Sequence, residues 1–323
     1  MRRLWLTFVA VLIGGAGAVH AQAQTYPNRP VRIIVPYAAG GGVSILAQIV
    51  GNKMSELMKQ PIVVDNRPGA GGNVGADLVA KSPPDGYTVL LHTNAQAAAP
   101  ALYRALPFNP VTDFIPVTMV VATQYVIGGS LKHPATTLRE LAVDAKARPG
   151  ILNYGSSGPG STLHLLAEML KAIARVDIVH IPYRGDAPMI TALIANDIQL
   201  AFLPQPNGVT NVNANLIRGL AATGSERMDA LPKLSTAAEQ GFPGFESGGW
   251  IGMFVPAGTA TDIVLAIQQT VAQALAAPKV RDAILSSGQE PVGNSSAEFE
   301  AQFKAEIDKL AKLIERAQIP KLD

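Results

Sequence analysis

The sequence predicts an α/β fold in which mostly parallel sheets are covered by helices, and three observations support this prediction. The chain has 323 residues, of which 48% are hydrophobic and 15% charged, so it can bury the cores of two domains. Short β-branched runs alternate with segments of helical periodicity. Glycine-rich turns lie where a predicted strand leads into a predicted helix, which is typical of a βαβ unit.

The first 23 residues have the pattern of a secretory signal peptide. Arg2 and Arg3 precede an apolar stretch over 4–19, and Ala21-Gln22-Ala23 follows as a cleavage pattern. The alternative is a membrane anchor, but the stretch contains three glycines and is shorter than the roughly 20 residues that span a bilayer. We expect cleavage near Ala23 and export of the mature protein.

The first βαβ unit begins at 31–35, a β-branched run interrupted only by Arg32 that predicts a largely buried strand. Apolar residues over 44–58 approximate one helical face, and 62–64 predicts the next strand. The alternation then continues with a helix after Gly75, strands at 87–91, 114–121 and 125–128, and helices and strands in turn over 138–223.

The pattern changes near the C-terminus, where 241–249 is rich in Gly and Pro. A strand is predicted at 250–255, and three helical segments follow. In the last of them, Ser295 and Glu298 have the spacing of a capping box. The apolar residues behind this box form one stripe at 4,4,3,4 spacing, which predicts a helix packed on a core: Phe299, Phe303, Ile307, Leu310 and Ile314.

Charge and cysteine content exclude several functions. There are 26 basic and 24 acidic residues, and residues 1–23 hold two of the basic ones and none of the acidic ones, so the mature chain has 26 − 2 = 24 of each. Such a balanced chain lacks the basic surplus of a nucleic-acid-binding protein. The absence of cysteine excludes disulfides, thiolate metal sites and Cys nucleophiles. No two histidines have metal-ligand spacing, and we expect no metal and no cofactor.

Two glycine-rich turns are predicted to join a strand to a helix, one at 36–44 and one at 154–162. The second follows a strand expected at 151–154 and precedes a helix expected at 163–173. Each turn would place free backbone N–H groups at the positive end of a helix dipole, where carboxylates and phosphates bind. A tight turn alone needs only one glycine, and the three glycines over 40–42 therefore indicate close approach of another group.

Three enzyme or nucleotide motifs fail at specific positions. Gly155 and Gly160 have the spacing of a Walker A loop, but Ser161 stands in place of its lysine. A third glycine cluster at 68–75 resembles a dinucleotide fingerprint, but Val74 stands where the last glycine belongs, which favours a structural turn. The hydrolase pattern G-x-S-x-G does not occur.

Ordered motifs over nearly the whole mature chain resemble the substrate-binding proteins of tripartite tricarboxylate transporters, the Bug (Bordetella uptake gene) family. In order along the chain, these motifs are Tyr26-Pro27-Asn28-Arg29-Pro30, Ile33-Ile34-Val35-Pro36, Gly40-Gly41-Gly42, Asn66-Arg67-Pro68-Gly69-Ala70-Gly71-Gly72, Pro84-Asp85-Gly86-Tyr87-Thr88, Leu102-Tyr103, Gly158-Pro159-Gly160-Ser161, His164-Leu165, Ile181-Pro182-Tyr183-Arg184-Gly185, Trp250 and Pro256-Ala257-Gly258-Thr259.

This resemblance implies a protein located in the periplasm, with a two-domain, type II-like Venus flytrap fold of mixed sheets covered by helices. It places domain 1 at 24–124 plus 248–323 and domain 2 at 125–247, with crossings near 122–125 and 245–250. It also implies a monomer that binds a small carboxylate between the domains and delivers it to a membrane permease. Family ligands are held mainly by backbone N–H groups, hydroxyls and water, which agrees with the two glycine turns.

The resemblance also assigns ligand contacts to four segments of the chain. The assigned residues are Tyr37, Ala39, Gly40, Gly41, Val43 and Ser44 in the first turn; Thr93, Asn94 and Gln96 after the third strand; Ser156, Ser157, Ser161 and Thr162 in the second turn; and Arg184, Gly185, Asp186 and Ala187. An alternative role for Arg184 is that of a solvated surface residue.

One departure from the family pattern bears on the ligand. The family commonly has Thr-Asp after the glycines, whereas this chain has Val43-Ser44. The ammonium group of an amino acid would need the carboxylate that is missing here, so its loss disfavours an amino-acid ligand. The added apolar side chain of Val43 tolerates a flatter or longer carboxylate. We therefore expect an aliphatic or aromatic di- or tricarboxylate, such as terephthalate, rather than aspartate or glutamate.

Two other functions remain open at this point. One is a periplasmic sensor whose closed form is read by a signalling protein. The other is an exported hydrolase that uses Ser156 or Ser157 with His164, but no orienting acid or elbow motif accompanies these residues. We therefore expect a binding protein and no enzyme.

Overall fold

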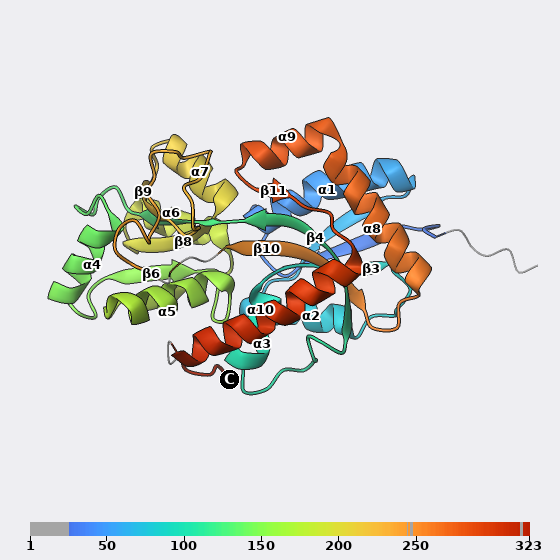
Figure 1. Cartoon of the computed structure of the whole chain (residues 1–323), viewed down its shortest axis with the longest axis horizontal. Coiled ribbons are helices and arrows are strands. Elements are labelled where there is room, and N and C mark those ends of the chain that lie inside the picture. The colour runs from blue at the N-terminus through green and yellow to red at the C-terminus, as the bar shows by residue number, and fades with distance from the viewer. Residues whose placement is uncertain (1–25, 244, 246–247, 317–318) are drawn as a thin grey trace, which may run out of the picture.

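The computed structural model describes residues 26–243, 245, 248–316 and 319–323. The predicted signal peptide, residues 1–23, lies outside the described residues. Two sheets lie end to end along the long axis of the molecule, and strands β4 and β10 lie near its middle (Figure 1). Over the described ranges, no helix is both long enough and apolar enough to span a membrane.

The first sheet has six strands. Their order is β11 (Glu290–Pro291), β4 (Phe114–Thr123), β10 (Gly249–Pro256), β3 (Thr88–Thr93), β1 (Val31–Val35) and β2 (Ile62–Asn66). Strand β1 is parallel to β2 and β3, whereas β10 is antiparallel to β3 and β4. The sheet is therefore mixed, as the family resemblance implied.

Both faces of this sheet are buried, and successive side chains of β1 enter apolar cores on opposite faces. Val31, Ile33 and Val35 belong to one apolar core and Ile34 to the other. The first core is covered by α1 (Gly42–Met58), α8 (Thr261–Ala276) and α9 (Pro278–Ser286). The second is covered by α2 (Asn73–Ala80), α3 (Ala95–Leu102) and α10 (Ser296–Arg316), and a short 3-10 helix, η1 (Ala70–Gly72), precedes α2.

Helix α10 begins with the predicted capping box. The backbone N–H of Ser295 donates to Glu298 at 2.9 Å, and the backbone N–H of Glu298 donates to the Ser295 hydroxyl at 3.3 Å. The predicted apolar stripe then packs against the sheet, with the ring of Phe299 fully buried 5.2 Å from the ring of Trp250. This prediction is confirmed.

The second sheet has five strands. Their order is β7 (Val179–Pro182), β6 (Asn153–Ser156), β8 (Leu200–Pro204), β5 (Tyr125–Gly129) and β9 (Arg218–Ala222). Strand β6 is parallel to β7 and β8, and β5 is antiparallel to β8 and β9. Its helices are α4 (Leu138–Ala147), α5 (Thr162–Ala174), α6 (Asp186–Ala195) and α7 (Gln205–Asn213).

The chain passes between the sheets at two described places. Strand β4 of the first sheet ends at Thr123 and β5 of the second begins at Tyr125. The return lies between the end of β9 at Ala222 and the start of β10 at Gly249, and residues 246 and 247 of the crossing expected near 245–250 lie outside the described residues. Because β4 and β10 pair over their whole length, both passages leave the first sheet at the same end. That end is where the two sheets face each other.

Candidate functional site

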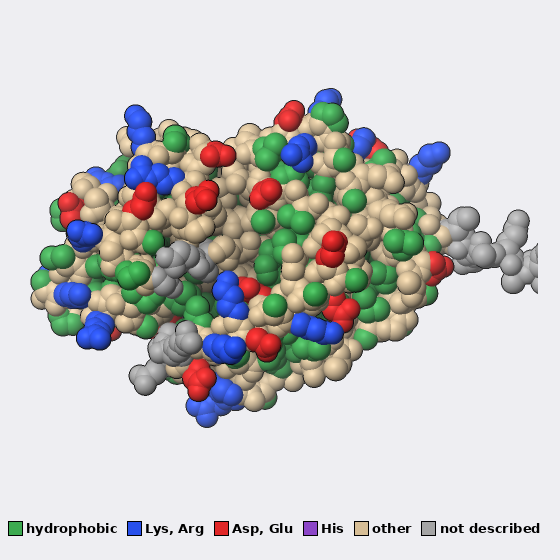
Figure 2. Space-filling view, viewed as in Figure 1, with side chains coloured by type: hydrophobic (Ala, Val, Ile, Leu, Met, Phe, Trp, Pro, Cys, Tyr) green, Lys and Arg blue, Asp and Glu red, His purple; other side chains and the backbone are tan. Residues whose placement is uncertain are grey.

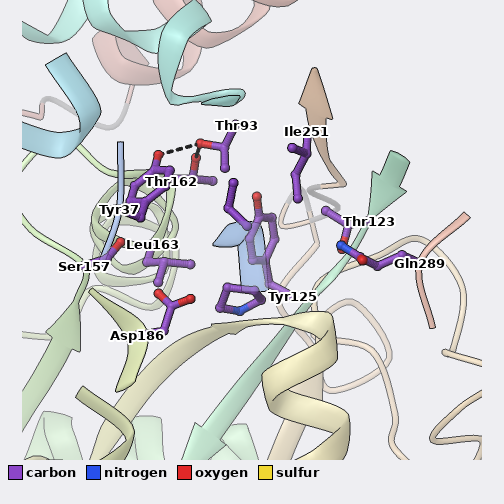
Figure 3. A pocket seen from close by; sticks show the side chains of 12 residues that line it. Tyr37, Thr93, Thr123, Tyr125, Ser157, Thr162, Leu163, Asp186, Ile251 and Gln289 are labelled. Carbon is purple, nitrogen blue, oxygen red and sulfur yellow. Dashed lines mark hydrogen bonds between the residues drawn. The ribbon is translucent and has the colours of Figure 1, made fainter. Parts of the chain in front are cut away.

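A small cavity lies between the two sheets and receives side chains from both (Figure 3). Its volume is about 30 Å³, enough for about two water molecules. The lining residues are Tyr37, Val43, Thr93, Thr123, Tyr125, Ser157, Thr162, Leu163, Asp186, Pro204, Ile251 and Gln289. A molecule larger than water therefore enters only if the walls move apart.

A larger cavity of about 470 Å³ adjoins the first, because Tyr37 and Ser157 line both. Its remaining lining comes from three loops: Pro36, Pro68, Gly69, Ala70, Gly158, Pro159, Pro182, Tyr183 and Arg184. Arg184 is exposed there. The two cavities together form the space between the sheets, which we call the cleft.

The first glycine turn joins β1 to α1 at the wall of the cleft. Gly40 has a φ of +83°, and Gly41 is the N-cap of α1 with no side chain to accept its free N–H groups. The Gly42 N–H donates to the carboxyl Oδ2 of Asp186 at 3.3 Å. A Cβ on Gly41 would lie 3.1 Å from the same oxygen. The glycines thus let a carboxyl group approach the positive end of α1, as the sequence predicted for this turn.

The second glycine turn joins β6 to α5 on the opposite wall. Gly158 and Gly160 have φ of +118° and +79°, and Ser161 caps α5 by accepting the N–H of His164 at 3.3 Å. The hydroxyl of Tyr103, from the first sheet's half, lies 2.9 Å from the carbonyl of Pro159 and 3.0 Å from that of Ala70. This turn is therefore held against the first sheet's loops.

A network of hydroxyl groups crosses the cleft between the two turns (Figure 3). The Thr162 hydroxyl donates to Oδ1 of Asn94 at 2.8 Å and lies 3.2 Å from the hydroxyl of Thr93. The Tyr37 hydroxyl lies 2.9 Å from that of Thr93, and the Tyr125 hydroxyl donates to Asn94 at 3.4 Å. Because Thr162 belongs to one sheet's half and Asn94 and Thr93 to the other, this network holds the cleft closed.

Of the described residues that line the small cavity, Asp186 alone carries a formal charge. Burial raises the pKa of its carboxyl to about 6, and the hydrogen bonds from Gly42 and Asn207 oppose that rise. Burial also raises the pKa of the Tyr37 and Tyr125 hydroxyls, so both rings stay neutral. Among the described lining residues, Asp186 is thus the group with a pKa near neutral pH.

Several predicted site residues meet at the small cavity. These are Tyr37, Val43, Thr93, Ser157, Thr162 and Asp186. Asn94 and Ser161 join the networks beside it, and Gly185 packs against Ala38 with a φ of +129°. Ala39, Gly40 and Ala187 are exposed.

Three other predicted residues are not part of the small cavity's lining. The Ser44 hydroxyl donates to Oδ1 of Asn66 at 3.3 Å at the end of β2. Gln96 is fully buried, and neither atom of its amide has a hydrogen-bond partner among the described residues. The Ser156 hydroxyl lies 2.7 Å from Nε2 of His180.

The hydrolase alternative paired Ser156 or Ser157 with His164, and the described residues show no hydrogen bond between His164 and either serine. His164 accepts the N–H of Gly160 at Nδ1, whereas His180 contacts Ser156 and stacks on the ring of Tyr154 at 4.8 Å. Burial, followed by the neighbouring His164, lowers the pKa of His180 to about 4. The nearby carboxylate of Glu168 accepts from Tyr154 and Lys171 instead. The described residues therefore place no acid in position to orient a Ser–His pair.

Other residues of the lining gave no site signal in the sequence. Thr123, Tyr125 and Ile251 lie at the passages between sheets, so their neighbourhood was predicted but their role was not. Gln289 precedes β11, and its buried Nε2 has no partner among the described residues. The described ranges also contain no cluster of His, Cys, Asp and Glu side chains that could hold a metal ion.

Comparison with known proteins identifies relatives over nearly the whole chain. Residues 46–319 match the family model described as the tripartite tricarboxylate transporter family receptor. A protein from the tcbD–tcbE intergenic region of Pseudomonas sp. strain P51 is 33% identical over 97% of this chain and 94% of its own length.

Solved structures agree with this match. The periplasmic binding protein BugD has a TM-score of 0.89 at 31% identity, and R. palustris Rpa4515 with adipate has 0.88 at 36%; each match covers 92% of this chain and 100% of the other. The malate-bound MatC from Rhodopseudomonas palustris has a TM-score of 0.87 at 28% identity, whereas a ligand-free relative from Polaromonas has 0.63 at 27%. Each covers 90% of this chain and 100% of its own.

At nearly equal identity, the fold thus resembles the malate-bound relative more than the ligand-free one. The structural neighbours are binding proteins rather than enzymes, in agreement with the prediction that the chain has no catalytic role. The resemblance read from its ordered motifs is confirmed, and the chain belongs to the family of tripartite tricarboxylate transporter receptors.

Proposed function

We propose that this chain is a periplasmic solute-binding protein that encloses a small carboxylate in the cleft and delivers it to a membrane permease of the tripartite tricarboxylate type. The observation that carries the proposal is the small cavity itself. Hydroxyl groups and helix N-termini from both sides of the cleft converge on this cavity. The chain also belongs to the family of these receptors. The relatives solved with adipate and malate support a carboxylate as the ligand class.

Movement of two domains relative to each other would admit a solute to the cleft, because the small cavity as it stands has room for only about two water molecules. We propose that residues 24–124 with 248–323 move as one unit and residues 125–247 as the other. The passages near Thr123 and Gly249 would act as hinges, because each connects the sheets at the rim of the cleft. The resemblance to a malate-bound relative supports a closed arrangement.

The energetics require enclosure rather than a surface contact. A helix N-terminus contributes about 0.3–2 kcal/mol to an anion, whereas micromolar affinity needs about 8 kcal/mol. Hydrogen bonds from hydroxyls such as those of Thr93, Thr162 and Ser157 add about 1 kcal/mol each. Burial of the ligand between Val43, Leu163 and Ile251 supplies the remainder. These apolar walls favour a di- or tricarboxylate with an aliphatic or aromatic body.

Calorimetric titration of the mature protein tests the proposal. The ligands are adipate, malate, citrate and terephthalate, with adipamide as the matched neutral analogue of adipate. We expect at least one acid to bind and to raise the melting temperature, and NMR of the recovered ligand to show it unchanged. Equal binding of adipate and adipamide, or no binding of any acid, would contradict the carboxylate proposal. A chemically altered ligand would contradict the non-enzymatic role.

A further inference from the structure

The carboxyl group of Asp186 lies where the cleft would be expected to receive the carboxylate of a ligand. Asp186 is the first residue of α6, and its Oδ2 accepts the N–H of Gly42 at the start of α1. The same oxygen accepts from the side-chain amide of Asn207 at 3.3 Å. Both hydrogen bonds that the described residues give this carboxyl end on Oδ2, and the side chain points into the cavity beside Leu163 (Figure 3).

Among the described residues, no positive side chain forms an ion pair with this carboxyl. The elements packed around it contribute Gly42 and Val43 from α1, Asn207 from α7, and the neutral rings of Tyr37 and Tyr125. The nearest cation along the chain is Arg184, which is exposed and lines the larger cavity instead. An ionised Asp186 is therefore a buried, unpaired charge that would repel a carboxylate ligand entering the same space.

The hydrogen-bond pattern fits the neutral acid. Oδ2 acts as the carbonyl oxygen, since both of its partners are donors, and Oδ1 is left to carry a proton toward the cavity. In that form Asp186 donates to a carboxylate rather than repelling it. The apolar side chains of Val43, Leu163 and Pro204 on the same cavity wall favour the neutral state.

Resting on the proposed function, we propose that Asp186 selects the ligand by holding a carboxylate through its own protonated carboxyl group, so that each ligand binds together with one proton from solvent. A protonated Asp186 makes the cleft selective for ligands that have a carboxylate, and no ammonium group, next to Asp186. It also couples affinity to pH. Burial raises the pKa of Asp186 to about 6. Without a ligand, the Asp186 carboxyl is therefore mostly ionised at neutral pH, and it gains the proton only on binding.

The number of protons taken up on binding tests this proposal directly. Titration calorimetry at about pH 7, in buffers of different ionisation enthalpy, measures that number without relying on a variant. The probes are glutarate, adipate and glutamate, where glutamate is glutarate with one added ammonium group. The variants are Asp186→Asn and Asp186→Ser, with Asp197→Asn as the control because Asp197 is exposed just beyond α6.

We expect the wild type and Asp197→Asn to take up about one proton per dicarboxylate and to lose about tenfold in affinity per pH unit above about 6. Asp186→Asn should take up almost none and should bind glutarate at about pH 8 at least tenfold more tightly than the wild type. No proton uptake by the wild type would overturn the proposal. Preference for glutamate that Asp186→Asn abolishes would show instead that Asp186 accepts an ammonium group. If no dicarboxylate binds to the wild type or to any variant, the proposed function itself is contradicted.

Discussion

Replacement of Thr162 by valine should weaken ligand binding by opening the cleft. Valine keeps the shape of the side chain and removes the hydroxyl that contacts Asn94 at 2.8 Å and Thr93 at 3.2 Å across the cleft. At about 1 kcal/mol per hydrogen bond, the closed form loses about 2 kcal/mol, which corresponds to an affinity about thirtyfold lower. The side-chain Oδ1 of Asn94 then keeps, among the described residues, the longer hydrogen bond from Tyr125 at 3.4 Å.

Thr118→Val is the matched control for this prediction. Thr118 is also a buried threonine, but its hydroxyl donates to the carbonyl of Asn294 at 2.7 Å within the first sheet's half. This control should lower the melting temperature and leave affinity unchanged. Calorimetry with the tightest ligand of the panel and thermal unfolding without ligand separate the two effects. If Thr162→Val stays within about threefold of the wild type, or if Thr118→Val loses as much affinity, the cross-cleft network does not stabilise the bound form.

Two further predictions concern stability. Because burial lowers the pKa of His92 to about 3 and that of His180 to about 4, their neutral forms stabilise the fold fully above about pH 6.5, and that stability is lost as the pH falls toward these values. The raised pKa of Asp186 acts in the opposite direction, because the protonated carboxyl gains stability as the pH falls, but over a smaller range. The melting temperature should therefore decrease as the pH is lowered from about 6.5 to about 4. A melting temperature that stays constant or increases over this range would be inconsistent with buried neutral histidines. Phe299→Ala removes a fully buried ring between Trp250 and Phe254, and urea unfolding should show a loss of about 3–5 kcal/mol with a red shift of Trp250 emission. A loss below about 1 kcal/mol would mean that α10 does not depend on this aromatic contact.

Elements with a strong local pattern were predictable from the sequence. The strand predicted at 31–35 has the same bounds in β1, and the capping box and apolar stripe of α10 are present as expected. Helix α3 was not predicted, because its run of alanines with Pro100 inside has no polar and apolar alternation. The strand expected at 151–154 lies two residues later as β6, since Ile151 is 60% exposed and Tyr154 is fully buried.

The predictable parts of the site are the glycine turns, whose backbone N–H groups lie at the start of a helix. Three adjacent glycines before a helix indicate a turn that another group approaches closely, and Gly40 to Gly42 form such a turn. The group in contact there, Asp186, lies 144 residues away in the sequence, and only the tertiary fold brings it to Gly42. Ser156 likewise pairs with His180 rather than with His164, because His180 on β7 lies beside β6 in the sheet.

Charge balance makes local recognition necessary. On the face drawn in Figure 2, basic and acidic side chains are interspersed, with no large area of one sign. Residues 24–323 hold equal numbers of basic and acidic residues, so long-range attraction does not concentrate anions near this part of the chain. Hydroxyls, helix N-termini and the acid form of Asp186 are the groups in the cleft that we expect to bind a carboxylate.

Identification of the natural ligand tests the central claim most directly. The mature protein is purified from periplasm without added solute, denatured, and the released small molecules are measured by mass spectrometry against protein that carries Thr162→Val. We expect a carboxylic acid to be released from the wild type in near-stoichiometric amount and from the variant in a smaller amount. Stoichiometric release of a compound without a carboxyl group would contradict the claim that the cleft binds carboxylates.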